Sequence, residues 1–159
     1  MIRCIAILTL LILLTACGRS SAPDASVPGL YPNETPAIRA LINENAARYD
    51  VPPALIHRVI QRESDYRPEA RNGPYYGMMQ ILPATARTMG HQGPASELLD
   101  PDTNLRYGVR YLRGAWLLSD GDFDTAVGWY ARGYYYEARN RCMLVETGLL
   151  DREIRRDCR

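Results

Sequence analysis

Apolar residues recur every three or four positions along most of this chain, which is the period of an amphipathic α-helix. The first such stretch follows Thr35 and Pro36, a pair typical of a helix start. Pro52-Pro53 ends that helix and begins a second one, which runs to Glu63. Its apolar face holds Leu55, Ile56, Val59 and Ile60, and Glu63 continues the same face.

Four more helical stretches are expected further along. Pro83 opens a short helix that Gly90 can close, and residues 102–118 form a long one capped by Asp100 or Asp102. The last two contain residues 123–130 and 133–147. Residues 73–80 hold two Gly, one Pro and two Tyr and are too irregular for a helix, and no alternating pattern predicts a strand. We therefore expect one mainly α domain over residues 36–159.

Glu63 is the first candidate for chemistry. A carboxyl group on a buried face loses hydration, which raises its pKa, and a Glu that stays partly protonated can act as a general acid. The periodicity also allows a solvated Glu at a helix end, or one paired with Arg62 or Arg67.

Three motifs decide between these alternatives. The chain reads E-S-x-Y-x-P-x-A from Glu63, G-M-M-Q-I-x-P-x-T-A from Gly77 and D-P-x-x-N-L-x-x-G-x-x-Y-L from Asp100. In this order, over about residues 36–140, they resemble the Slt-type lytic transglycosylases of bacterial cell walls.

The resemblance implies a mainly α, lysozyme-like fold, with an irregular segment that can hold short strands along the cleft. It implies an enzyme, a carbon–oxygen lyase that acts on peptidoglycan without a cofactor or metal. Glu63 would protonate the oxygen between N-acetylmuramic acid and N-acetylglucosamine, then take the proton of the muramoyl C6 hydroxyl as a 1,6-anhydro ring closes. Most glycosidases use two carboxylates, whereas only Glu63 is well placed here.

The same resemblance assigns supporting roles. Ser64 would donate a hydrogen bond near the acid or the substrate N-acetyl group, although a polar residue at a helix end is an equal alternative. Tyr130 would hold the acid through its hydroxyl group. Gln80 would turn its amide toward the sugar, where it can donate and accept at once.

Three neighbours of Gln80 are further substrate-binding candidates. Met78 and Met79 could form the floor of the cleft, although Met often fills cores. Gly77 would let the backbone approach the substrate, or would simply form a turn. Ala131 departs from the family pattern A-Y-N-x-G, because it stands where the pattern has Asn.

The N-terminus is typical of an export signal. A charged start and a short apolar run precede Leu14-Thr15-Ala16-Cys17, which resembles the lipobox of bacterial lipoproteins. We expect a signal peptide at 1–16, lipidation of Cys17 and a flexible tether at 17–35, rich in Ser, Pro and Gly. An ordinary secretory signal is the alternative. By resemblance to the sorting of Gram-negative lipoproteins, Gly18 after the cysteine favours the periplasmic face of the outer membrane over the inner membrane.

Cys142 and Cys158 are the two cysteines left after export and lipidation. In an oxidising compartment such a pair most simply forms a disulfide, while metal binding lacks ligands at suitable spacing. His57 and His91 are expected at the surface.

Charge adds one exclusion. All 19 basic residues are Arg, and without Arg3 the remaining 18 match the 18 acidic residues. With no basic block, nothing suggests a nucleic acid partner.

The expected partners are therefore glycan strands and, through Cys17, a membrane; the pattern identifies no dedicated partner in the envelope machinery. Two alternatives to a lytic transglycosylase stay open. One is a hydrolytic lysozyme, and the other is a glycan-binding or scaffold module of an envelope-spanning machine, which Ala131 favours.

Overall fold

The computed structural model describes residues 29–158. The expected signal peptide, Cys17 and the tether up to residue 28 lie outside the described residues. The helices of the described part are α1 (Pro36–Tyr49), α2 (Pro53–Glu63), α3 (Pro83–Thr88), the 3-10 helix η1 (Ala95–Leu99), α4 (Pro101–Leu117), α5 (Phe123–Arg132) and α6 (Tyr135–Asn140). The hairpin of β1 (Arg71–Asn72) and β2 (Tyr75–Tyr76) lies between α2 and α3. This composition confirms the prediction of a mainly α fold of lysozyme-like character.

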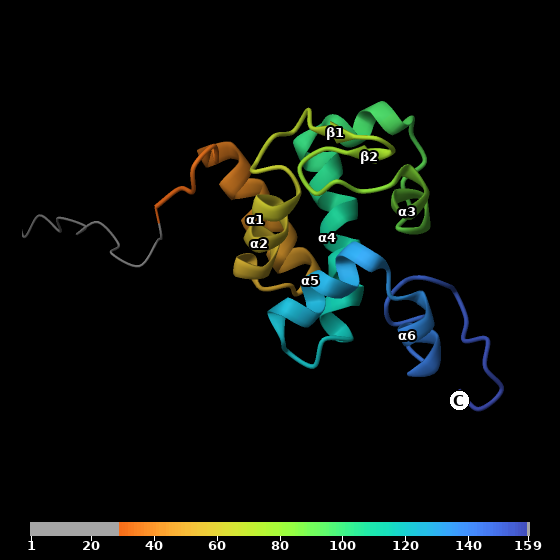
Figure 1. Ribbon diagram of the computed structural model, residues 1–159. Helices are drawn as coiled ribbons and strands as arrows, with labels where there is room; N and C mark the ends of the chain where they lie inside the picture. The colour runs from red at the N-terminus through yellow and green to blue at the C-terminus, as the bar shows by residue number, and fades with distance from the viewer. Residues whose placement is uncertain (1–28, 159) are drawn as a thin grey trace, which may run out of the picture.

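Helix α4 runs through the middle of the domain (Figure 1). It contacts α1 and α5 toward one end, and α3 and η1 near the hairpin. The buried core between α1, α2, α4 and α5 consists mainly of aliphatic side chains: Ile42, Leu55, Ile56, Val59, Ile60, Leu105, Val109, Leu112, Ala126 and Val127. Each large aliphatic side chain buried there contributes about 1.5–3 kcal/mol.

Helix starts follow the sequence signals. The Thr35 side chain accepts a hydrogen bond from the Ile38 backbone N–H, at 3.2 Å. Asp100, rather than Asp102, caps α4 by accepting from the Thr103 N–H at 2.9 Å. These caps satisfy donors that the first helical turn leaves without partners.

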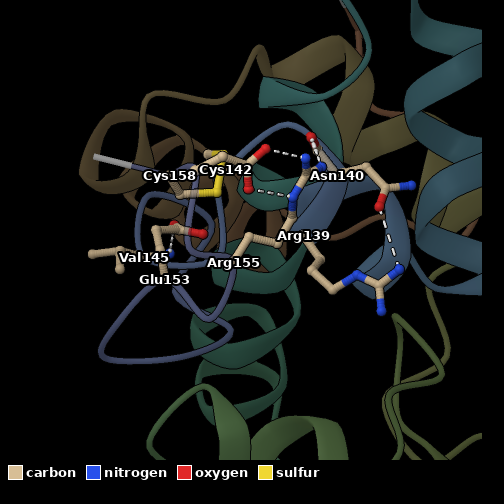
Figure 2. Close-up of a disulfide and its surroundings, with 8 residues drawn as sticks. Arg139, Asn140, Cys142, Val145, Glu153, Arg155 and Cys158 are labelled. Atoms are coloured by element: carbon tan, nitrogen blue, oxygen red, sulfur yellow. Dashed lines mark hydrogen bonds and ion pairs between the residues drawn. A yellow bond between two sulfur atoms is a disulfide. The ribbon is translucent and has the colours of Figure 1, made fainter.

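The prediction of a helix over residues 133–147 is wrong, because α6 ends at Asn140. Cys142 has a φ of 57°, a left-handed conformation that an α-helix cannot include. The predicted disulfide between Cys142 and Cys158 is confirmed, and it fastens the C-terminal segment to the end of α6 (Figure 2). Arg155 supports this connection by donating to the Asn140 carbonyl at 2.9 Å.

Both histidines are buried, so their predicted surface location is wrong. His57 is covered by Tyr31, whose ring centre lies 4.9 Å away, and its Nδ1 lies 2.8 Å from the Tyr66 hydroxyl. His91 packs edge-on against Tyr107 and hydrogen-bonds Glu97 at 3.1 Å. Much of this cover comes from other elements, which helical periodicity does not reveal.

A buried amide fastens the hairpin region to α4. Asn104 is fully buried, and its side chain accepts from the Met79 N–H at 2.8 Å. It also donates to the carbonyls of Tyr76 and Leu98, at 2.9 and 2.8 Å. One side chain thus connects α4, η1 and the segment that carries Gln80.

Among residues 29–158, no helix has the length and apolar character required to cross a membrane.

Candidate active site

Glu63 is the last residue of α2, and its side chain is 22% exposed. The apolar face that precedes it is fully buried, as the sequence predicted. Burial raises the pKa of Glu63 above its ordinary value, although the positive charge of Arg62 partly opposes the shift. The nearest Arg62 nitrogen lies 3.7 Å from the carboxylate, which is too long for a strong ion pair.

A groove opens beside this carboxyl group. One cavity of about 340 Å³ is lined by Arg62, Glu63, Asn72, Tyr75, Gln80, Tyr130 and Ala131. A neighbouring cavity of about 300 Å³ is lined by Tyr75, Gln80, Ile81, Leu82, Thr85, Tyr111, Tyr130, Ala131, Arg132 and Gly133. Four residues line both, so the two cavities are adjacent parts of one groove, which suits a chain-like ligand. Among the described residues that line it, Glu63 carries the sole carboxyl group.

Gln80 borders both cavities, and its backbone is left-handed, with a φ of 46°. Its amide nitrogen donates to the Gly77 carbonyl at 2.8 Å and to the Ala70 carbonyl at 3.1 Å. The donors are therefore used within the protein, and the amide oxygen is the atom that can accept from a ligand. This differs from the expectation that the amide donates and accepts at once.

Tyr130 also lines both cavities, but its hydroxyl donates to the Met79 carbonyl at 2.8 Å rather than to the acid. Burial raises the pKa of Tyr130 well above 10, and the nearby charge of Glu63 adds to the shift. The phenol is therefore neutral at ordinary pH and fixed in place at the wall of the groove.

Ser64 faces the interior instead of the groove. Its hydroxyl donates to the Met78 carbonyl at 2.8 Å and accepts from the Arg67 N–H at 3.3 Å. Neither of these hydrogen bonds of the Ser64 hydroxyl involves Glu63, so the expected hydrogen bond near the acid is not formed. Ser64 instead fastens the end of α2 to the segment that leads to Gln80.

Met78 and Met79 have no exposed surface, so the expectation that they form the cleft floor is wrong. Met79 packs closely against Gly108, where an added Cβ would lie 2.5 Å from its sulfur. Gly77 has a φ of 70°, and a Cβ there would lie 2.3 Å from both the Asn104 amide and the Leu98 carbonyl. Close packing, rather than approach to a substrate, explains this glycine.

The structure thus gathers Glu63, Gln80, Tyr130 and Ala131 around one groove. It also adds Asn72 and Tyr75, which the sequence did not single out as site residues. Their place in a short hairpin depends on pairing that the residue pattern did not reveal. Within residues 29–158, no three His, Cys, Asp or Glu side chains are grouped to hold a metal ion.

Comparisons with known proteins cover the same region. A family model described as "Transglycosylase SLT domain" matches residues 40–140. A "Transglycosylase" of Enterobacteria phage PRD1 is 34% identical over 93 residues, which are 58% of this chain and 33% of that protein. A "Membrane-bound lytic murein transglycosylase C" of Haemophilus influenzae (strain PittEE) is 34% identical over 92 residues, 53% of this chain and 25% of that protein.

A protein of the same description from Yersinia pestis (strain Pestoides F) is 35% identical over 80 residues, which are 45% of this chain and 22% of that relative. The chain therefore spans about a third or less of the length of these relatives.

Proposed function

Because the chain belongs to the transglycosylase SLT domain family, we propose that it cleaves the glycan strands of peptidoglycan without consuming water. The observation that carries the proposal is Glu63, a half-buried carboxyl group with a raised pKa in the wall of a groove that offers no second acid among its described lining residues. One group must then act as both acid and base.

The reaction begins with Glu63 protonated. Its proton passes to the oxygen that joins N-acetylmuramic acid to N-acetylglucosamine, and the bond from that oxygen to the muramoyl anomeric carbon breaks. The substrate's own N-acetyl group stabilises the electron-poor carbon, as in other substrate-assisted glycosidases. The muramoyl C6 hydroxyl then attacks this carbon and gives its proton to the Glu63 carboxylate. A 1,6-anhydro ring forms, and the acid is restored.

The surrounding residues support both steps. The Gln80 amide oxygen can accept a hydrogen bond from a hydroxyl or acetamido N–H of the sugar, because its own nitrogen is held by two backbone carbonyls. Tyr130 supplies a neutral wall beside the acid, and its burial helps to keep water and charge away from the carboxyl group. Both features favour the protonated form that the first step needs.

The test digests purified sacculi with the wild type and with Glu63→Gln, and identifies the released muropeptides by mass spectrometry. We expect anhydromuropeptides from the wild type and none from the variant. Glu69→Gln is the matched control, since Glu69 is exposed and lies outside the lining of the groove. Equal release by wild type and Glu63→Gln would refute the role of Glu63.

One observation favours a second candidate, a glycan-binding module without activity. Ala131 lines both cavities, so the wall of the groove lacks the polar side chain that the family pattern places there. Binding of glycan strands by the wild type with no release of muropeptides would support this candidate.

For location, we propose an envelope protein held by lipid on Cys17, with residues 1–16 removed and the tether connecting the anchor to the domain. The support is the lipobox-like sequence and the relatives described as membrane-bound. Cys17→Ala should move the exported protein from the detergent phase to the aqueous phase of a phase-separation assay. Unchanged partitioning would contradict lipidation.

A further inference from the structure

Residues 29–35 precede the region that the family model matches, yet they form a defined structure against the domain. We call them the N-terminal brace. The Glu34 N–H donates to the Tyr31 carbonyl at 3.0 Å, and the Tyr31 N–H donates to the Glu34 carboxylate at 2.9 Å. These reciprocal bonds make a closed turn just before α1, within the stretch that the sequence assigned to the tether.

A buried ion pair fixes the brace to α1. The Glu34 side chain has no exposed surface, and Arg39 donates to its two oxygens through Nε and Nη2, each at 2.6 Å. Burial alone would raise the pKa of Glu34, but the hydrogen bond from Arg39 and the other favourable contacts hold it below its ordinary value. These two hydrogen bonds fix the position of the brace relative to α1, because any other position would leave the buried charge of Glu34 without a partner.

The brace also contacts Asp65 and Tyr66, the second and third residues after Glu63. The Asn33 amide donates to the Asp65 carboxylate at 2.7 Å. The Tyr31 ring stacks on Tyr66, with ring centres 6.0 Å apart and planes 16° from parallel. On its inner side, Tyr66 is held by His57 of α2 through a 2.8 Å hydrogen bond.

The turn held in this way is strained. Asp65 and Tyr66 both have left-handed backbones, with φ of 53° and 63°. A non-glycine residue in that region costs on the order of 1–3 kcal/mol and persists where the surroundings define it. Two such residues in succession, separated from the last residue of α2 by Ser64 alone, need external support, and the brace provides part of it.

We propose that the N-terminal brace positions Glu63 by holding the Asp65–Tyr66 turn against α2, which makes Tyr31 and Asn33 positioning residues for the reaction. This inference rests on the proposed function, since Glu63 is the group positioned. When the turn loosens, the last turn of α2 can fray, and the carboxyl group can move out of the groove wall into water. A displacement of about 1 Å can cost up to about 100-fold in rate.

The experiment uses the full exported chain and the double variant Tyr31→Ala/Asn33→Gly. Glycine keeps the left-handed backbone of residue 33, where φ is 63°, and removes only the amide. Tyr31→Phe is the conservative comparison, because it keeps the ring that stacks on Tyr66. Ile42→Val is the control for stability alone, since it shortens a fully buried side chain of α1 outside the brace.

The first readout follows the Glu63 carboxyl carbon by NMR during a pH titration, and it requires no activity. We expect the pKa of Glu63 to fall toward the ordinary value in the double variant, because the carboxyl group gains water. Tyr31→Phe and Ile42→Val should titrate like the wild type. The groups that face Glu63, Arg62 from α2 and Tyr130 from α5, are the same in all four proteins.

The second readout is the rate of anhydromuropeptide release. We expect kcat to fall about tenfold in the double variant, within the loss that a displaced group can cause. KM should be nearly unchanged, since the groove residues other than Glu63 stay in place. Tyr31→Phe and Ile42→Val should both retain the wild-type rate. An unchanged pKa of Glu63 in the double variant, or an equal change of that pKa in Ile42→Val, would refute the proposed role of the brace. A wild type that releases no anhydromuropeptides, but whose titration shifts as described, would refute the proposed function and leave the brace supported.

Discussion

Glu63 is a residue whose place in the fold opposes its own ionisation. Because burial raises its pKa, the folded protein binds the Glu63 proton more tightly than the unfolded chain does. This tighter proton binding stabilises the fold fully at a pH below the pKa of Glu63 in the unfolded chain, about 4.3. The stabilisation is lost as the pH rises through the higher pKa of Glu63 in the folded protein. Ionised Glu63 thus destabilises the fold at neutral pH.

This leads to the first prediction, on Glu63→Gln. A neutral amide of similar shape removes the cost of burying a charge, so the variant should melt at a higher temperature than the wild type at pH 7. The gain should shrink as the pH falls below the unfolded pKa of about 4.3, because the wild-type carboxyl group then becomes protonated in both states. Thermal melts of both proteins across this range measure the effect, and a gain that does not change with pH would argue against it.

The second prediction concerns Ala131, which borders both cavities. Ala131→Asn would add a donor and an acceptor at the wall of the groove. One hydrogen bond contributes about 0.5–1.5 kcal/mol net, so KM for glycan strands should fall roughly two- to tenfold. Ala131→Ser is a shorter polar comparison and should have a smaller effect. A higher KM in Ala131→Asn would contradict this prediction, because it would mean that the bound glycan occupies the space that the Asn side chain needs.

For single residues, the sequence predicted which ones belong to the site more accurately than it predicted the role of each. The raised pKa of Glu63 could be predicted, because an apolar stripe directly precedes it. The internal bonds of Ser64 and Tyr130 could not, because their acceptors are carbonyls of residues 78 and 79, brought near by the fold. Met78 and Met79 were ambiguous between core and cleft, and complete burial places them in the core.

Among the elements, the segment between the hairpin and α3 leaves no room for a side chain at Gly77. Gly77 lies between Asn104 of α4 and the Leu98 carbonyl, and its backbone is left-handed. We predict that Gly77→Ala lowers the free energy of unfolding by at least about 3 kcal/mol, from backbone strain plus overlap with both neighbours. Urea unfolding measures this loss.

Gly73→Ala is the matched comparison for that prediction. Gly73 has a similar φ of 57°, but an added Cβ would have no atom within 4 Å. It should cost only the backbone term, about 1–2 kcal/mol. Similar losses in the two variants would show that the contacts with Asn104 and Leu98 add nothing.

The long helices could be predicted because each follows a cap or a proline and keeps one apolar face. α1, α2, α4 and α5 all meet this description, and the structure has them within a residue or two of the expected bounds. α6 could not be predicted at its true length, since Cys142 lies within a helical pattern but has a left-handed backbone. η1 and the hairpin are too short for periodicity to reveal.

For the molecule as a whole, the C-terminal segment depends on a covalent connection. Cys142 and Cys158 are 16 residues apart, and a disulfide that closes a loop of this size contributes about 3 kcal/mol. The double change Cys142→Ser/Cys158→Ser should therefore lower Tm by roughly 10 °C. Muropeptide release at lower temperature should persist, because neither cysteine lines the groove. A double variant that melts like the wild type would show that the segment is held by its other contacts.

The central claim for the whole molecule is that one carboxyl group breaks the glycan strand and the substrate's own hydroxyl group completes the reaction. Digestion of sacculi in water enriched in ¹⁸O, followed by mass spectrometry of the fragments, tests this claim most directly. We predict 1,6-anhydro ends without ¹⁸O in the wild-type products, and no release by Glu63→Gln. Reducing ends that carry ¹⁸O would show that water attacks the anomeric carbon, and would contradict the account.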